Sequence, residues 1–164
     1  MSIETRRATA ADLPRIVDIY NSTVASRLVT ADTEPVTVES RTEWFHNHSD
    51  QRPIFLFLQE DETIGWFSFE AFYGRPAYDK TVELSLYLDE HYRGRGIGSQ
   101  AVAQMKDIAA TLDIETLLAF VFAHNSRALM LFKNHGFTEY GRLPDVATMD
   151  GSHYSLSILG YKVD

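Results

Sequence analysis

The sequence predicts one α/β domain built on a mixed sheet, and three observations support this. Helical and strand patterns alternate along the chain, as in a sheet covered by helices. The chain has 164 residues and 45% hydrophobic content, which is enough for one domain with a real core. A long helical pattern joins two apolar strand patterns, so those two strands should be parallel. We therefore expect a single domain over 1–164, of the α/β or α+β class.

The first half of the chain predicts a strand, two helices and an antiparallel hairpin. Pro14 suits the first turn of the first helix, and Thr9 or Asp12 can cap it. The charged tripeptide at 60–62 separates two apolar strand patterns, which is typical of a hairpin. The expected elements are, in order, a strand over 3–7, a helix whose apolar face runs from Leu13 to Val24, a loop over 26–36, a helix over 38–48, and strands over 54–59 and 63–69.

The second half predicts a strand, a long helix, a second strand, a helix and a final hairpin. In the first of these strands the leucines share one face, while Glu83, Ser85 and Tyr87 share the other. Asp150-Gly151 is a strong signal for the last turn. The expected elements are a strand over 81–88, a helix over 96–112, a strand over 116–122, a helix over 125–135 ended by Gly136, and strands over 138–142 and 153–159.

Composition and charge argue against several classes of function. The net charge of −8 disfavours nucleic-acid binding, which needs a basic face. The absence of cysteine excludes disulfides, thiolate metal sites and cysteine nucleophiles. We expect no metal, because His46 and His48 would not face each other on a helix. Residues 1–7 lack the apolar core of a signal peptide, and no apolar run is long enough to span a membrane. We therefore expect a cytoplasmic protein without membrane contact.

A glycine-rich stretch lies between the 81–88 strand and the long helix. Its three alternate glycines let backbone N–H groups approach a ligand closely, and the helix start adds the positive end of a dipole. This combination predicts a phosphate or pyrophosphate site. The spacing is neither that of a Walker loop nor that of a dinucleotide fingerprint. The stretch reads Arg93-Gly94-Arg95-Gly96-Ile97-Gly98-Ser99.

Two motifs resemble those of the GNAT acyl-coenzyme A-dependent N-acetyltransferases. Arg93, Gly96 and Gly98 match the R/Q-x-x-G-x-G/A pyrophosphate loop, and the segment 125–137 resembles N-x-x-A-x-x-L-Y-x-x-x-G-F. The resemblance implies a central mixed sheet of about seven strands, splayed at the cofactor site and flanked by about four helices. It also implies acetyl-coenzyme A (acetyl-CoA) as cofactor. The residues that it places against acetyl-CoA are Leu86, Tyr87, Leu88, Arg93, Gly94, Arg95, Gly96, Ile97, Gly98, Ser99, Asn125, Ala128, Phe132 and Lys133.

A narrower resemblance links the chain to the phosphinothricin and methionine sulfoximine N-acetyltransferases. It rests on short segments at 33–35, 43–44, 73–78, 81–83 and 150–153. It implies a small-molecule acceptor with an α-amine, detoxification of amino-acid analogues such as phosphinothricin, methionine sulfoximine or methionine sulfone, and a homodimer. Arg75 has the planar fork that suits a carboxylate clamp. The residues expected at the acceptor are Arg75, Tyr78, Glu34 and His153.

Glu83 is the candidate catalytic base, because a carboxylate beside the cofactor strand can accept the proton of an ammonium group. The alternative is a surface or salt-bridged glutamate on a half-exposed strand. Phe132 departs from the tyrosine that many relatives carry and cannot donate a proton. A thiol with a pKa of about 8.5 can nevertheless leave as thiolate. We expect direct transfer in a ternary complex. A polyamine, a protein or peptide amine as acceptor, and a non-catalytic acetyl-CoA-binding module remain as alternatives.

Overall fold

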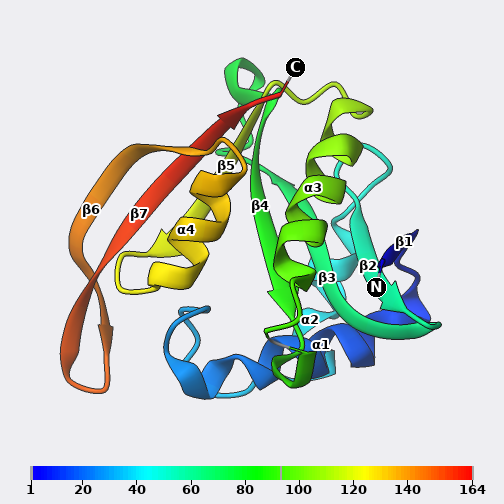
Figure 1. Cartoon of the computed structure of the whole chain (residues 1–164), viewed down its shortest axis with the longest axis horizontal. Helices are drawn as coiled ribbons and strands as arrows, with labels where there is room; N and C mark the ends of the chain where they lie inside the picture. The colour runs from blue at the N-terminus through cyan, green and yellow to red at the C-terminus, as the bar shows by residue number, and fades with distance from the viewer. Residues whose placement is uncertain (1, 93, 164) are drawn as a thin grey trace.

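The computed structural model describes residues 2–92 and 94–163, and these form one sheet flanked by helices (Figure 1). The strands are β1 (Glu4–Arg7), β2 (Ile54–Gln59), β3 (Glu62–Ala71), β4 (Thr81–Leu88), β5 (Thr116–Phe122), β6 (Thr138–Met149) and β7 (Ser152–Lys162). The α-helices are α1 (Leu13–Ser22), α2 (Val38–His46), α3 (Ile97–Ala110) and α4 (Ser126–Asn134). The predicted α+β class and the number of strands and helices are confirmed for the described residues.

The sheet has the strand order β1-β2-β3-β4-β5-β7-β6, and each face carries its own core. Helices α3 and α4 lie in front of the sheet in Figure 1, and their core includes Phe67, Val82 and Met105. Helices α1 and α2 cover the other face, where Ile16 and Trp66 are buried. The predicted alternation along β4 is seen, because Leu84 joins the first core and Tyr87 packs against the second.

Strands β4 and β5 separate halfway along their length. Both are parallel, as predicted, but they pair only from Thr81↔Thr116 to Leu84↔Ala119. From Ser85 to Leu88, β4 keeps its pairing with β3 and has none with β5. The remaining half of β5 pairs with β7 alone. The backbone of β4 over 85–88 therefore presents an open edge inside the molecule.

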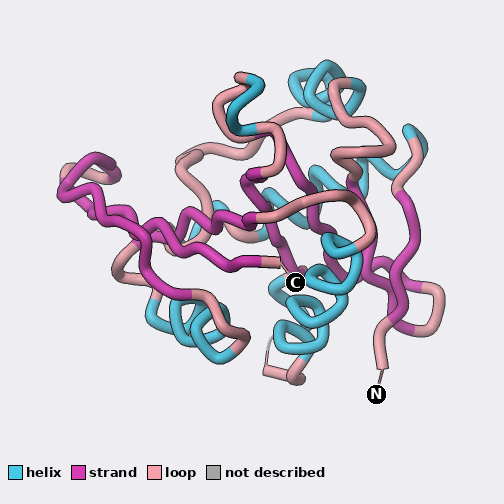
Figure 2. The backbone as a smooth tube through the Cα atoms, turned by 90° about the horizontal axis from the view of Figure 1, so that it is seen from above, coloured by secondary structure: helices cyan, strands magenta, loops and turns pink. Residues whose placement is uncertain are grey.

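Strands β6 and β7 form a long hairpin that extends away from the body of the protein (Figures 1 and 2). They are longer than the predicted 138–142 and 153–159. Pro144 and the positive φ of 51° at Asp145 interrupt the alternation of β6, and the register shifts between Leu143 and Ala147. The predicted turn is present: Asp150 and Gly151 both have positive φ, 52° and 81°.

A buried carboxylate ties α1 to the end of β4. Asp89 is 5% exposed and accepts a hydrogen bond of 2.7 Å from Arg15 Nη2. Arg15 also donates to the carbonyl of Thr63 in β3. The amide of His91 donates to the second Asp89 oxygen at 3.0 Å, which fixes the start of the glycine-rich stretch. This network holds the end of the open edge in position.

Candidate active site

A continuous groove runs from the glycine-rich stretch into the gap between β4 and β5. Its outer part has a volume of about 1130 Å³, counted with its open mouth, and is lined by Gly94, Gly96 and the start of α3. Its inner part, of about 560 Å³ by the same measure, lies between Leu84–Tyr87 of β4 and Ala119–Phe122 of β5. The two parts share five lining residues, Val29, Leu86, Asn125, Ala128 and Phe132.

The glycine-rich stretch is shaped to receive an anion at the mouth of this groove. Gly94 and Gly96 have φ of +77° and +72°, a conformation that residues with a side chain rarely adopt. A Cβ at either position would meet nothing within 4 Å, so the space above the backbone is open. Gly96 is the N-cap of α3, so the free N–H groups of the first helical turn point to the same place.

The other residues predicted in this stretch have several roles. Gly98 permits close helix packing, because an added Cβ would lie 3.2 Å from Leu131 Cδ2 of α4. Ile97 is buried in the core, and Ser99 Oγ lies 2.9 Å from His135 Nε2. Arg95 is exposed, with its guanidinium over the Tyr92 ring at 5.3 Å. Arg93 lies outside the described residues.

Residues of α4 form the wall of the groove opposite β4. Asn125 caps the helix by accepting a hydrogen bond of 3.2 Å from the Ala128 amide. Its side-chain amide donates to the carbonyl of Leu28, which joins α4 to the loop between α1 and α2. Phe132 is 5% exposed and lines both parts of the groove. Lys133 is exposed and lines neither part.

Glu83 lies at the inner end of the groove with its carboxylate half-buried. Within the part of the chain that the structure describes, this carboxylate has no hydrogen-bond or ion-pair partner. Burial raises the pKa of Glu83, and the negative charge of Glu70 on β3 raises that pKa further. The described residues therefore show no salt bridge to Glu83, and its role as a base stays a prediction.

A second cavity, of about 480 Å³ counted with its opening, lies between the sheet and the helices α1 and α2. Ser85 and Tyr87 line both this cavity and the groove. Burial raises the pKa of Tyr87 well above its ordinary value, so its hydroxyl stays protonated. The remaining lining residues are Ile16, Val17, Tyr20, Val36, Arg41, Trp44, Trp66 and Glu70.

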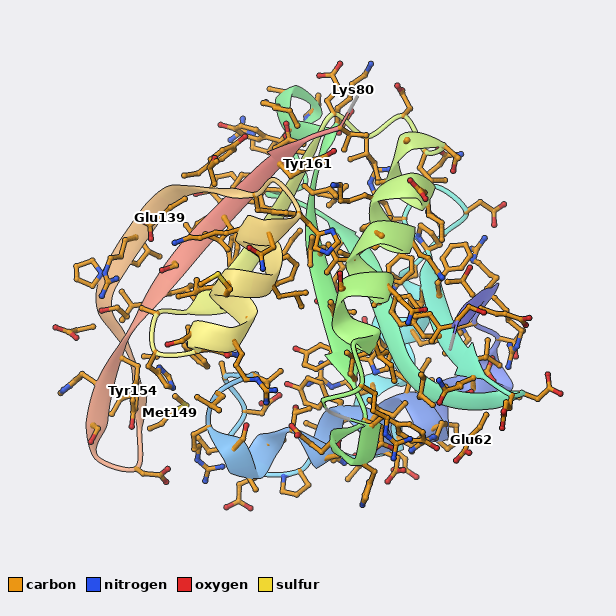
Figure 3. All side chains as sticks on the ribbon, viewed as in Figure 1. Glu62, Lys80, Glu139, Met149, Tyr154 and Tyr161 are labelled. Atoms are coloured by element: carbon orange, nitrogen blue, oxygen red, sulfur yellow. The ribbon has the colours of Figure 1, made fainter. Side chains whose placement is uncertain are left out.

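The four residues expected at the acceptor do not line these cavities. Arg75 and Tyr78 are exposed in the loop before β4, at the end of the strand that Lys80 marks in Figure 3. Glu34 is exposed in the loop between α1 and α2, and His153 is exposed on the protruding hairpin. The structure does not bring these four together with Glu83, and their contact with an acceptor stays a prediction.

Two site features were missed by the sequence reasoning. Glu70 lies directly opposite Glu83 in the β3–β4 register, and Arg41 lines the second cavity. Residue spacing could have shown that Glu70 shares a face with Trp66 and Ser68, but the long β3–β4 loop leaves the register open.

In the described residues, no group of three or more histidine or acidic side chains could hold a metal ion. None of the described helices has the length and the apolar character that a membrane span needs.

Comparison with known proteins places these features in a family. Residues 16–137 match the family described as Acetyltransferase (GNAT) family. The chain is 53% identical to the protein YwnH of Bacillus subtilis, over 94% of this chain and 96% of that protein. It is 27% identical to an L-methionine sulfoximine/L-methionine sulfone acetyltransferase of Pseudomonas aeruginosa, over 100% of this chain and 96% of that one.

A solved structure shows the same fold with a ligand. It is the crystal structure of a GNAT superfamily phosphinothricin acetyltransferase from Sinorhizobium meliloti in complex with acetyl-CoA. The TM-score is 0.92 at 25% identity, and the match covers 99% of this chain and 89% of that one.

Proposed function

Because the chain belongs to the GNAT family and is an acetyl-CoA-dependent N-acetyltransferase, we propose that its acceptor is the α-amine of a small amino-acid analogue. Phosphinothricin, methionine sulfoximine and methionine sulfone are the candidates, since relatives carry these names. The observation that carries the proposal is the groove that ends at Glu83, a half-buried carboxylate without a partner among the described residues.

The described residues fit acetyl-CoA. The open β4 edge at Leu86–Leu88 offers unpaired backbone groups to an extended amide-bearing chain. The open space above Gly94 and Gly96, at the N-terminus of α3, suits a pyrophosphate. When bound, the cofactor supplies an acetyl thioester, whose carbonyl carbon is the electrophile.

Glu83 would take the proton of the substrate's ammonium group, directly or through one water molecule. An α-amine has a solution pKa of about 8, so a modest base is sufficient. The raised pKa of Glu83 makes it a better proton acceptor near neutral pH than an ordinary glutamate. Phe132 would exclude water beside the thiol without supplying a proton. Without cysteine, the chain offers no cysteine nucleophile, in keeping with direct transfer in a ternary complex.

The test is the release of free coenzyme A thiol with acetyl-CoA and a panel of amines. Saturable turnover confined to phosphinothricin, methionine sulfoximine and methionine sulfone is expected. Turnover only on spermidine or a lysine peptide would overturn the acceptor assignment. Acetyl-CoA binding without turnover on any amine would favour a non-catalytic module.

The role of Glu83 is tested by Glu83→Gln, which keeps the shape of the side chain and removes its basicity. We expect a loss of turnover of at least a hundredfold with unchanged affinity for acetyl-CoA. Glu139→Gln is the matched control, because Glu139 is exposed on β6 (Figure 3). Near-normal turnover of Glu83→Gln at every pH would exclude Glu83 as the base.

The homodimer stays a prediction, and light scattering can measure the mass of the protein in solution.

A further inference from the structure

We propose that Glu70 is the second carboxylate of the amine site. Its negative charge, held beside Glu83 on the same face of the sheet, makes Glu83 a stronger proton acceptor. The proposal rests on the function proposed above and assigns Glu70 a positioning role, because it acts through Glu83 rather than taking the proton itself.

The sheet register brings the two carboxylates together. Glu70 and Glu83 are direct cross-strand partners in the antiparallel β3–β4 pair. Directly opposite residues project to the same face with Cβ atoms about 5 Å apart. Like charges in this position destabilise a sheet, so the pair has a structural cost. A cost of this kind is tolerated where the charges serve binding or catalysis.

Contacts from α2 fix Glu70 in position. Trp44 Nε1 donates a hydrogen bond of 2.7 Å to Glu70 Oε1. The Trp44 ring in turn packs edge-on against Trp66, with centroids 5.4 Å apart. Because Trp44 is a neutral donor, it orients the carboxylate without cancelling its charge. The Glu70 side chain is 34% exposed and lines the second cavity, which shares Ser85 and Tyr87 with the groove that Glu83 lines.

Among the described residues, the neighbouring basic groups either lie beyond hydrogen-bond distance of Glu70 or pair with another carboxylate. His48 Nε2 lies 3.8 Å from Glu70 Oε1, too far for a hydrogen bond. His48 Nδ1 lies 2.8 Å from the Trp44 carbonyl and must donate to it, so in neutral His48 the buried Nε2 carries no proton. Arg41 lines the same cavity, but its guanidinium pairs with Asp32 at 3.0 Å.

The groups around Glu83 determine in which direction its pKa is shifted. Its neighbour on β5 is Leu118, and the loop between α1 and α2 contributes Leu28 and Val29. Among the residues that the structure describes, Glu70 is thus the charged group that acts on Glu83. A negative neighbour disfavours the ionised form, so it raises the pKa of Glu83 in addition to the effect of burial. Removing the charge of Glu70 must lower this pKa.

The test is Glu70→Gln, which can still accept the hydrogen bond from Trp44. The ratio kcat/KM with methionine sulfone is measured against pH. We expect the midpoint of the acid limb of this pH profile to fall by about 0.5 to 1 pH unit. This magnitude is the interaction expected between two charges at this separation in a partly solvated site. Glu70→Asp keeps the charge and should keep the midpoint near that of the wild type, even if kcat falls. Glu139→Gln should leave it unchanged.

A second measurement does not depend on turnover. The carboxyl carbon of Glu83 is titrated by NMR in the wild type and in Glu70→Gln without substrate, and the same downward shift is expected. An unchanged Glu83 titration in folded Glu70→Gln would overturn the proposal, even if Glu83→Gln were inactive. Near-normal turnover of Glu83→Gln would instead remove the proposed base, and the role of Glu70 with it.

Discussion

Replacing Gly96 by alanine tests whether the glycine-rich stretch binds the cofactor's phosphates. Gly96 has φ of +72°, and a Cβ there would meet nothing within 4 Å. The cost to the free protein is therefore conformational alone, about 1 to 2 kcal/mol for a non-glycine residue in this region. For a chain of this length that corresponds to a fall in melting temperature of roughly 2 to 8 °C.

The cost to binding should be larger, because the added methyl group occupies the space through which a phosphate would approach the N-terminus of α3. A lost hydrogen bond to a charged group costs about 1.5 to 3 kcal/mol, which is roughly a tenfold to hundredfold rise in Kd for acetyl-CoA. Isothermal titration calorimetry measures Kd, and differential scanning calorimetry of the free protein measures the melting temperature.

Gly151→Ala is the matched control for this experiment. Gly151 has φ of +81°, and a Cβ there would also meet nothing within 4 Å, but it lies in the turn of the β6–β7 hairpin. It should lose similar stability and keep the affinity of the wild type for acetyl-CoA. Equal affinities in the two variants would refute the assignment of the phosphate site to Gly96.

Three further predictions concern the ends of β4 and the acceptor loop. In Gly65→Ala the new Cβ would lie 2.8 Å from the Tyr87 carbonyl oxygen. Urea unfolding should therefore show a free energy of unfolding lower by about 1 to 3 kcal/mol, and Kd for acetyl-CoA should rise. An unchanged free energy of unfolding would mean that β3 and β4 can move apart freely. Burial favours a raised pKa for Asp89, but hydrogen bonds from the His91 amide and Arg15 outweigh it and hold that pKa below its ordinary value. The stabilisation is therefore present above the unfolded pKa of about 3.9 and is lost as pH falls through the folded pKa. Asp89→Asn should destabilise the protein by about 2 to 4 kcal/mol near pH 7 and by progressively less in acid. A difference in unfolding free energy between the variant and the wild type that does not vary with pH would contradict this. Arg75→Ala should chiefly raise KM for amino-acid acceptors, by roughly tenfold or more if the carboxylate clamp exists, and an unchanged KM would remove that role.

Local sequence patterns were sufficient to predict the order of the elements, and they support a proposal for the cofactor side of the site. The alternation in β4 placed Glu83 on one face and the leucines on the other, and Gly94 and Gly96 favoured an anion site before α3. These signals are contained in a few consecutive residues. The length of β6 was underestimated because Pro144 and the positive φ at Asp145 break its alternation.

The proposed acceptor side depends on contacts between distant segments, and these could not be predicted. Glu70 becomes a neighbour of Glu83 only through the β3–β4 register. Arg41 reaches its cavity only because α2 packs over the same face as α1. The order of residues along the chain contains neither the register nor the packing of helices on the sheet.

The open edge of β4 has a consequence for the aggregation of the protein without its cofactor. Four consecutive residues, Ser85 to Leu88, lack a neighbouring strand on the side of β5. An unpaired strand edge can recruit another extended chain, including an unfolded copy of the same protein. A ligand that pairs with this edge would remove that opportunity and add a stabilisation that grows with the logarithm of its concentration. Depletion of acetyl-CoA would then shorten the lifetime of the protein as well as stop its reaction. Purification with acetyl-CoA in the buffer should reduce aggregation.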